Sequence, residues 1–136
     1  MKEVYLVNCC RTAVGKFQGS LAKTPAPVMG GIVIKEALKR SGLKPENVDE
    51  VMFGNILTAA LGQNPARQAA IKAGIPYSVP AYTVGMVCGS GMKTLIEGAR
   101  AIMAGEADVI VAGGMENMTA APYAVPTARG GARMFN

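Results

Sequence analysis

The feature that most constrains this chain is a regular alternation of short apolar runs with longer amphipathic segments. Apolar runs at 4–9, 48–54, 81–87 and 107–112 have the length of buried strands, and a helix-length segment separates each from the next. Apolar strands joined through helices pair in parallel, because the helices then cover both faces of the sheet. The sequence therefore predicts an α/β fold, with a mostly parallel sheet covered by helices on both faces.

The expected helices carry start and stop signals. The first two each begin at a capping residue followed by proline and end at glycine, over Thr24-Pro25 to Gly42 and Asn64-Pro65 to Gly74. The third is expected over 89–104, before Gly105. The order of elements is then β-α-β-α-β-α-β within residues 1–118, and no internal repeat or linker interrupts it.

Composition and charge narrow the classes of function. Half of the 136 residues are hydrophobic and 17% are charged, which is typical of a globular protein. The net charge is +5, but the basic residues are spread along the chain, so a nucleic-acid partner is not indicated. No apolar run approaches the ~20 residues of a membrane span, and the first residues lack a signal-peptide layout. We therefore expect a cytoplasmic protein with no membrane partner.

The chain contains three cysteines, Cys9, Cys10 and Cys88, and no histidine. Three cysteines are too few for a disulfide framework and lack the spacing of metal ligands, so we expect no metal site and no prosthetic group. Cys9 and Cys10 are interpreted as core residues of the first strand, because neighbours in a strand point to opposite faces and form only a strained disulfide.

Cys88 is the candidate nucleophile, because it lies where a predicted strand meets a predicted helix. Such a turn resembles the nucleophile elbow of other α/β enzymes. The helix start supplies unpaired N–H groups and a partial positive charge, and both favour the reactive thiolate. Gly89 and Gly91 permit a tight turn and the close approach of a substrate or another backbone. On these residues alone, a buried cysteine with a packing role stays an open alternative.

Two nucleotide-binding interpretations of the same stretch are disfavoured. Gly89-Ser90-Gly91 could begin a dinucleotide fingerprint, but Thr94 stands where the third glycine belongs. A phosphate-binding loop needs glycine directly before Lys-Ser/Thr, and here Met92 precedes Lys93.

Four stretches, in order along the chain, resemble the thiolase family in its bacterial acetyl-CoA acetyltransferase type. They are 11–19 (Arg-Thr-Ala-Val-Gly with a later Phe and Gly), 62–69 (Gly-Gln-Asn-Pro-Ala-Arg-Gln-Ala), 87–93 (Val-Cys-Gly-Ser-Gly-Met-Lys), and 112–118 (Ala-Gly-Gly-Met-Glu-Asn-Met) with Pro122-Tyr123. The resemblance implies a three-layer fold, with 1–118 as the N-terminal domain and 119–136 as the start of a loop region. The C-terminal domain of the family is then expected outside these residues.

The resemblance also implies a chemistry. Cys88 would attack a coenzyme A thioester, take the acyl group and pass it to a second acyl-CoA, or cleave a 3-ketoacyl-CoA in reverse. Exchanging one thioester for another is close to neutral in energy, so an acyl-cysteine intermediate is accessible. The backbone amide of Cys88 would help to hold the oxyanion. The family further implies a homo-oligomer whose dimer interface includes 81–87.

Two departures limit this expectation. Gly85 stands where the family usually has asparagine, three residues before the nucleophile. The family's second domain brings the histidines and the second cysteine that move protons, and this chain has no histidine. We therefore expect little turnover without a C-terminal half, in cis or in trans. The alternative is a non-catalytic oligomerisation or binding domain that retains the fold, with apolar surface exposed on 89–104.

Overall fold

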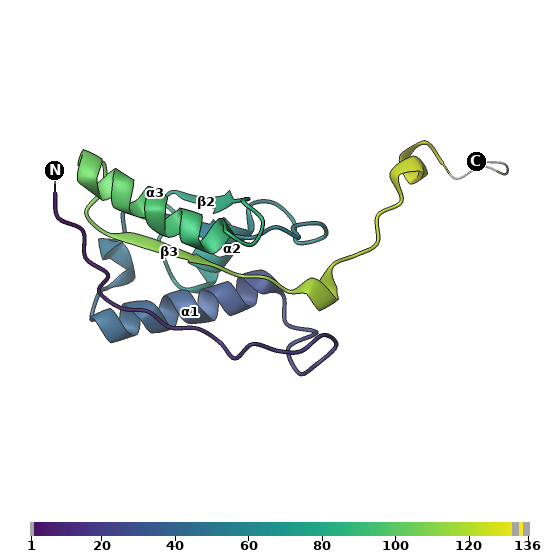
Figure 1. The fold of residues 1–136 in the computed structure, drawn as a ribbon, viewed down its shortest axis with the longest axis horizontal. Coiled ribbons are helices and arrows are strands. Elements are labelled where there is room, and N and C mark those ends of the chain that lie inside the picture. The colour runs from purple at the N-terminus through teal and green to yellow at the C-terminus, as the bar shows by residue number, and fades with distance from the viewer. Residues whose placement is uncertain (1, 132–133, 135–136) are drawn as a thin grey trace.

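The computed structural model describes residues 2–131 and residue 134, and its main body has three layers (Figure 1). The middle layer is a parallel sheet of β1 (Glu50–Gly54), β2 (Ala81–Val84) and β3 (Ile110–Gly114), in the order β2-β1-β3. Helices α1 (Ala26–Ser41) and α2 (Pro65–Lys72) cover one face, and α3 (Ser90–Ala104) covers the other. The predicted α/β fold, with helices on both faces of a parallel sheet, is confirmed.

Three short 3-10 helices lie outside these layers. They are η1 (Pro45–Asn47), between α1 and β1, and η2 (Met118–Ala120) and η3 (Pro126–Gly130), after β3. Figure 1 shows the chain leaving the layered body after η2.

The core lies between the sheet and the pair α1–α2. Val51 and Phe53 of the central strand point toward these helices, where Ile34, Leu38 and Ala69 are also buried. On the other face, Ile110 and Ala112 lie against Gly98 of α3. This alternation along apolar strands is the pattern of a sheet that is buried on both sides.

The helix boundaries confirm most of the predicted signals. The Asn64 side chain accepts a hydrogen bond from the Arg67 N–H at 3.1 Å, and Pro65 is the first residue of α2. Gly42, Gly74 and Gly105 follow the three helices in left-handed conformations, with φ between 70° and 90°. The predicted cap at Thr24 is wrong, because α1 begins two residues later and its N-cap residue is Pro25.

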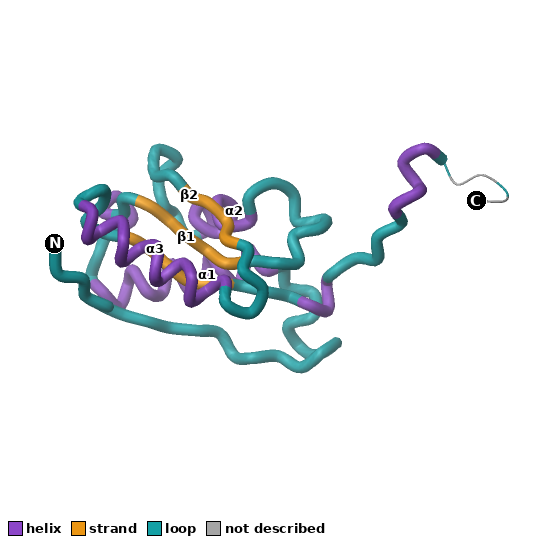
Figure 2. Tube along the Cα trace, turned by 45° about the horizontal axis from the view of Figure 1, so that its top comes forward, coloured by secondary structure: helices purple, strands orange, loops and turns teal. Residues whose placement is uncertain are grey.

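The predicted first strand is also wrong. Residues 4–9 run as an extended segment past α1, outside the sheet, in the views of both Figure 1 and Figure 2. A strand needs a hydrogen-bonding neighbour, and this segment has none among residues 2–131. Its contacts are instead an ion pair between Lys2 and Asp108 and a hydrogen bond from Arg40 to the Cys9 carbonyl. Leu6 and Val7 are consequently exposed.

The interpretation of both N-terminal cysteines as core residues fails for the same reason. Cys9 is exposed, and Cys10 is half-buried with its thiol donating to the Val33 carbonyl at 3.1 Å. The limits of all three strands also differ from prediction. β1 begins at Glu50, where residue 48 was expected. β2 ends at Val84, because the chain turns away there, and β3 spans Ile110–Gly114 where 107–112 was expected.

The amino-terminal ends of β1 and β3 are joined by a carboxylate. Asp49 Oδ2 accepts hydrogen bonds from the N–H groups of Asp108 and Val109, at 2.8 and 2.9 Å. These two backbone bonds hold the pKa of Asp49 below its usual value, with a smaller contribution from the charge of Lys2. A carboxyl with a lowered pKa stabilises the fold above its unfolded pKa, and that contribution is lost as the pH falls through the folded pKa.

We expect Asp49→Asn to lower the free energy of unfolding at pH 7 by about 1 kcal/mol, the effect of exposed charge-assisted hydrogen bonds after solvent screening. The difference from wild type should shrink as the pH falls toward 3, because the carboxyl of the unfolded chain takes up a proton before the carboxyl of the folded chain does. Urea denaturation at pH 7, 5 and 3 measures this. A difference that stays constant across the series would contradict the assignment.

Helices α1 and α2 approach each other closely at a pair of glycines. A Cβ atom added at Gly30 would lie 3.0 Å from Ala69 Cβ and 2.5 Å from Met115 Sδ. At Gly31 it would lie 2.8 Å from Lys72 Cβ. Larger residues would therefore push the two helices apart.

We expect Gly30→Ala to destabilise the fold by about 1–3 kcal/mol, because overpacking a tight core displaces its neighbours. Gly130→Ala is the matched control, since a Cβ there meets nothing within 4 Å, and it should change stability by no more than about 0.5 kcal/mol. Urea denaturation of both variants is the measurement. Equal effects of the two substitutions would contradict the packing argument.

Candidate functional site

Cys88 lies on the turn between β2 and α3, here called the Cys88 turn (residues 85–90), and its side chain is exposed. The turn is closed by two hydrogen bonds, from Gly89 N–H to Met86 O at 3.0 Å and from Ser90 N–H to Val87 O at 3.2 Å. Among the described residues, no acceptor stands in hydrogen-bonding geometry to the Cys88 N–H. The turn thus presents a thiol and a free amide together at the start of α3.

The turn is strained immediately before the cysteine. Val87 has φ of 47°, in the left-handed region, although it is a β-branched residue with an exposed side chain. Gly89 and Gly91, which the sequence analysis singled out, do not have positive φ. The reversal that exposes Cys88 is therefore made at Val87, at a cost of about 1–3 kcal/mol.

Ser90 stabilises this strained turn through two hydrogen bonds of its side chain. Its side chain is buried, and its hydroxyl accepts from the Met86 N–H at 2.8 Å and donates to the Val87 carbonyl at 2.7 Å. Sequence analysis missed this role, since it read Ser90 only as part of a possible glycine-rich motif. A serine at the first position of a helix, two residues after the nucleophile, is the signal that was available.

Three glycines let the start of α3 rest directly on the ends of two strands. A Cβ added at Gly54, the last residue of β1, would lie 2.6 Å from Ser90 Cβ and 2.9 Å from Gly91 N. A Cβ at Gly114, the last residue of β3, would lie 3.3 Å from Gly91 Cα. We call Gly54, Gly91 and Gly114 the glycine joint. It sets the height of the Cys88 turn above the sheet by contact between backbones.

A threonine fastens the glycine joint. Thr94 is fully buried, and its hydroxyl oxygen lies 2.6 Å from the Gly91 carbonyl oxygen and 3.0 Å from the Gly113 carbonyl oxygen. The hydroxyl can donate to either carbonyl, which links the first turn of α3 to β3. Thr94, which occupies the position of the third glycine of a dinucleotide fingerprint, therefore stabilises the packing of α3 on β3.

The charged side chains on α3 pair with one another. Glu97 accepts from Lys93 and, at 2.8 Å, from Arg100. The hydrogen bond from Lys93 is the main reason why the pKa of Glu97 lies below its usual value. Lys93 lies in the first turn of the helix that follows Cys88. Its positive charge is therefore paired with the carboxylate of Glu97.

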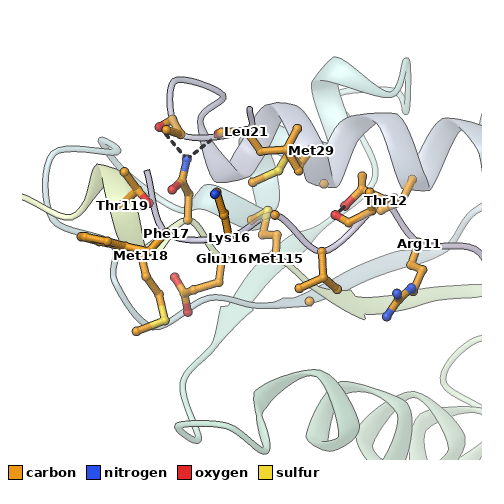
Figure 3. A pocket seen from close by; sticks show the side chains of 18 of the residues that line it. Arg11, Thr12, Lys16, Phe17, Leu21, Met29, Met115, Glu116, Met118 and Thr119 are labelled. Carbon is orange, nitrogen blue, oxygen red and sulfur yellow. Dashed lines mark hydrogen bonds between the residues drawn. The ribbon is translucent and has the colours of Figure 1, made fainter. Parts of the chain in front are cut away.

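Cys88 does not line either of two hollows that lie among the described residues. The first, of about 500 Å³, lies between residues 10–17, the end of β3 and α1. Figure 3 shows Lys16, Glu116 and Met118 at one end of it and Arg11 at the other. The second is an open depression at the carboxyl ends of β1 and β2, lined by polar side chains that include Asn55, Asn64 and Thr83. The candidate nucleophile therefore stands on the surface of this chain.

Within residues 2–131 and 134, no group of three or more His, Cys, Asp or Glu side chains could hold a metal ion. In the same part of the chain, none of the helices combines the length and apolar character that crossing a bilayer requires.

Comparison with known proteins places this site in a family context. Residues 4–136 match the family model described as the N-terminal domain of thiolase. An acetyl-CoA acetyltransferase of Cupriavidus necator is 61% identical over 134 residues, which are 98% of this chain and 34% of that protein. The corresponding protein of Schizosaccharomyces pombe is 53% identical over the same share of each chain, and the cytosolic one of Mus musculus is 52% identical over 120 residues. The chain spans about a third of the length of these curated relatives.

The strain at Val87 has a measurable consequence. We expect Val87→Gly to raise the free energy of unfolding by about 0.5–1 kcal/mol, because relief of the left-handed strain exceeds the added entropy of glycine in the unfolded chain. Val125→Gly is the matched control, since Val125 is equally exposed but has an ordinary φ of −115°. Urea denaturation should show no gain for the control. A loss of stability in Val87→Gly would contradict the strain.

Proposed function

The chain belongs to the thiolase family, as its N-terminal domain, and on this premise we propose that it supplies the nucleophile of an acetyl-CoA acetyltransferase. Cys88 is the proposed nucleophile and coenzyme A thioesters are the proposed substrates. The observation that carries the proposal is the Cys88 turn, which presents an exposed thiol and a free backbone N–H at the start of a helix.

In the proposed first step, the Cys88 thiolate attacks the carbonyl carbon of an acyl-CoA. The negative charge that develops on the carbonyl oxygen is met by the Cys88 N–H and by the positive end of α3. Collapse of this intermediate breaks the bond to coenzyme A, whose thiolate leaves, and the acyl group stays on Cys88 as a thioester. The glycine joint supports this step, since it holds the start of α3, and with it the Cys88 N–H, against the strand ends.

The second step requires groups from outside this chain. A second acyl-CoA must lose a proton beside its carbonyl before it attacks the acyl-cysteine, and proton transfer of this kind needs a positioned acid or base. The chain has no histidine, and it spans about a third of the length of its relatives. We therefore propose that a C-terminal half, in cis or in trans, completes the enzyme, and that residues 119–136 begin the loop region between the two.

The glycine that departs from the family pattern is compatible with this function. A Cβ at Gly85 would meet only Ile56 Cδ1 at 3.7 Å, an ordinary contact, and the residue does not have a positive φ. The position therefore accepts a Cβ atom, and the fold of the turn does not depend on glycine there.

A second candidate function is favoured by one observation. Met92, Leu95 and Ile96 on α3 expose apolar side chains, as do Met86 and Val87 on the adjoining turn. A contiguous apolar surface of this kind marks an interface. The chain could thus act as an oligomerisation or binding domain without turnover of its own, and a homo-oligomer is the proposed state in either case.

We expect acetyl-CoA to acetylate Cys88 in the isolated chain, with a rate about tenfold or more above that of Cys9, because only Cys88 stands at a helix start. Peptide mass spectrometry over a time course measures both sites in one sample. Cys88→Ala should abolish the fast phase, whereas Cys9→Ala, the control at another exposed cysteine, should keep it. Equal labelling of all three cysteines would contradict the proposal, and self-association by light scattering without labelling would favour the second function.

A further inference from the structure

Glu116 follows β3 in one of the motifs noted in the sequence, and its carboxylate gathers three donors from the segment that follows β1. Oε1 accepts from Asn55 Nδ2 at 2.5 Å and from Leu57 N–H at 3.1 Å, and Oε2 accepts from Ile56 N–H at 3.0 Å. Although Glu116 is exposed, both of its oxygens thus accept hydrogen bonds from one short stretch of the chain, residues 55–57. We call Asn55 and Glu116 the carboxyl-end clamp.

Asn55 extends the clamp to β2 and β3. Its N–H donates to Val84 O at the end of β2, at 3.2 Å, and its side-chain NH₂ also donates to Met115 O at 3.2 Å. Both partners of the NH₂ group are acceptors, so the amide has only one orientation that satisfies them. The clamp therefore joins the carboxyl ends of all three strands.

The clamp lies one residue beyond the glycine joint on β1 and two residues beyond it on β3. Gly54 precedes Asn55, and Gly114 is separated from Glu116 only by Met115, whose N–H donates to Gly54 O at 2.9 Å. The first turn of α3 rests on Gly54 and Gly114. Any spreading of these two strand ends would therefore tilt the Cys88 turn.

The burial of the Asn55 side chain in this clamp lowers the stability of the fold. Its side chain is almost fully buried, and among the described residues its Oδ1 atom has no hydrogen-bond partner. A buried carbonyl oxygen without a partner opposes folding. A residue that served stability alone would not leave a buried oxygen without a partner. The presence of Asn55 therefore indicates that it serves the arrangement of the strand ends.

We infer that Asn55 and Glu116 are positioning residues, which fix the spacing of the β1 and β3 ends and thereby the orientation of Cys88. The inference deepens the proposed function, because it assumes that the reactivity of Cys88 matters. It gives a role to Glu116 in the motif after β3. The proposed acyl transfer does not use this motif.

The chain contains a matched control for this inference. Asp49 accepts two backbone hydrogen bonds across the same pair of strands, β1 and β3, at their opposite ends. Glu116→Gln and Asp49→Asn each replace a carboxylate by a neutral amide between the same two strands, near the Cys88 turn and far from it. Glu116→Gln also removes one of two acceptor oxygens in use, whereas a single oxygen of Asp49 accepts both bonds. Asn55→Asp is a second test of the clamp, because it sets two carboxylates against each other.

Two readouts on the full 136-residue chain separate positioning from general loosening. The first is amide hydrogen exchange of Gly89, Ser90 and Lys93, whose N–H groups bond within the turn and the helix start. The second is the ratio of iodoacetamide alkylation rates of Cys88 and Cys9 in the same sample, measured by peptide mass spectrometry. Cys9 serves as the internal reference because it is exposed and lies on the N-terminal segment.

We expect Glu116→Gln and Asn55→Asp to speed exchange at these amides and to lower the Cys88 to Cys9 ratio, each by about three- to tenfold, the effect of one hydrogen bond of ordinary strength. Asp49→Asn should leave both readouts unchanged although it lowers stability. An unchanged ratio in both clamp variants, or an equal change in Asp49→Asn, would overturn the inference. A wild-type ratio of one or less would instead count against Cys88 as an activated nucleophile, and hydrogen exchange alone would then decide on the clamp.

Discussion

The parallel pairing of β1 with a strand on each side is the interaction on which the other parts of this structure depend. The backbone of β1 bonds to β2 on one edge and to β3 on the other, and its residues from Val51 to Asn55 are buried. A parallel sheet with such a strand at its centre must be covered on both faces, and the helices supply that cover. Because all three strands point the same way, their carboxyl ends meet at one edge, where Cys88, Asn55 and Glu116 lie.

Open α/β sheets commonly bind ligands at the edge where the carboxyl ends of the strands lie. At this edge, several neighbouring residues position the side chain of Cys88. Val87 makes a strained reversal, Ser90 holds it, and the start of α3 rests on glycine backbone. Under the function proposed above, this arrangement would serve acyl transfer through Cys88. The chain contains no histidine for the proton transfers that would complete such a reaction, and the enzyme proposed above is an assembly of two parts.

Local patterns predicted the helices, because caps such as Asn64 and terminal glycines act within a few residues of the chain. The apolar run at 48–54 correctly indicated a strand, but the equally apolar run at 4–9 did not form one, since a strand also needs a neighbour from elsewhere in the chain. Cys88 was singled out by its turn and by family resemblance. Ser90, Asn55 and Glu116 were missed, because their meaning lies in contacts such as that between Ile56 and Glu116, which are 60 residues apart.

The glycine joint separates the placement of Cys88 from the packing of the core. Where a helix rests on side chains, each substitution beneath it changes the height and tilt of the helix by a fraction of an ångström. At Gly54, Gly91 and Gly114 the contact is between main chains, whose dimensions are the same for every sequence. Substitutions among the hydrophobic core residues can therefore leave the Cys88 thiol in its place, whereas a side chain at Gly54 would meet Ser90 and displace the start of α3.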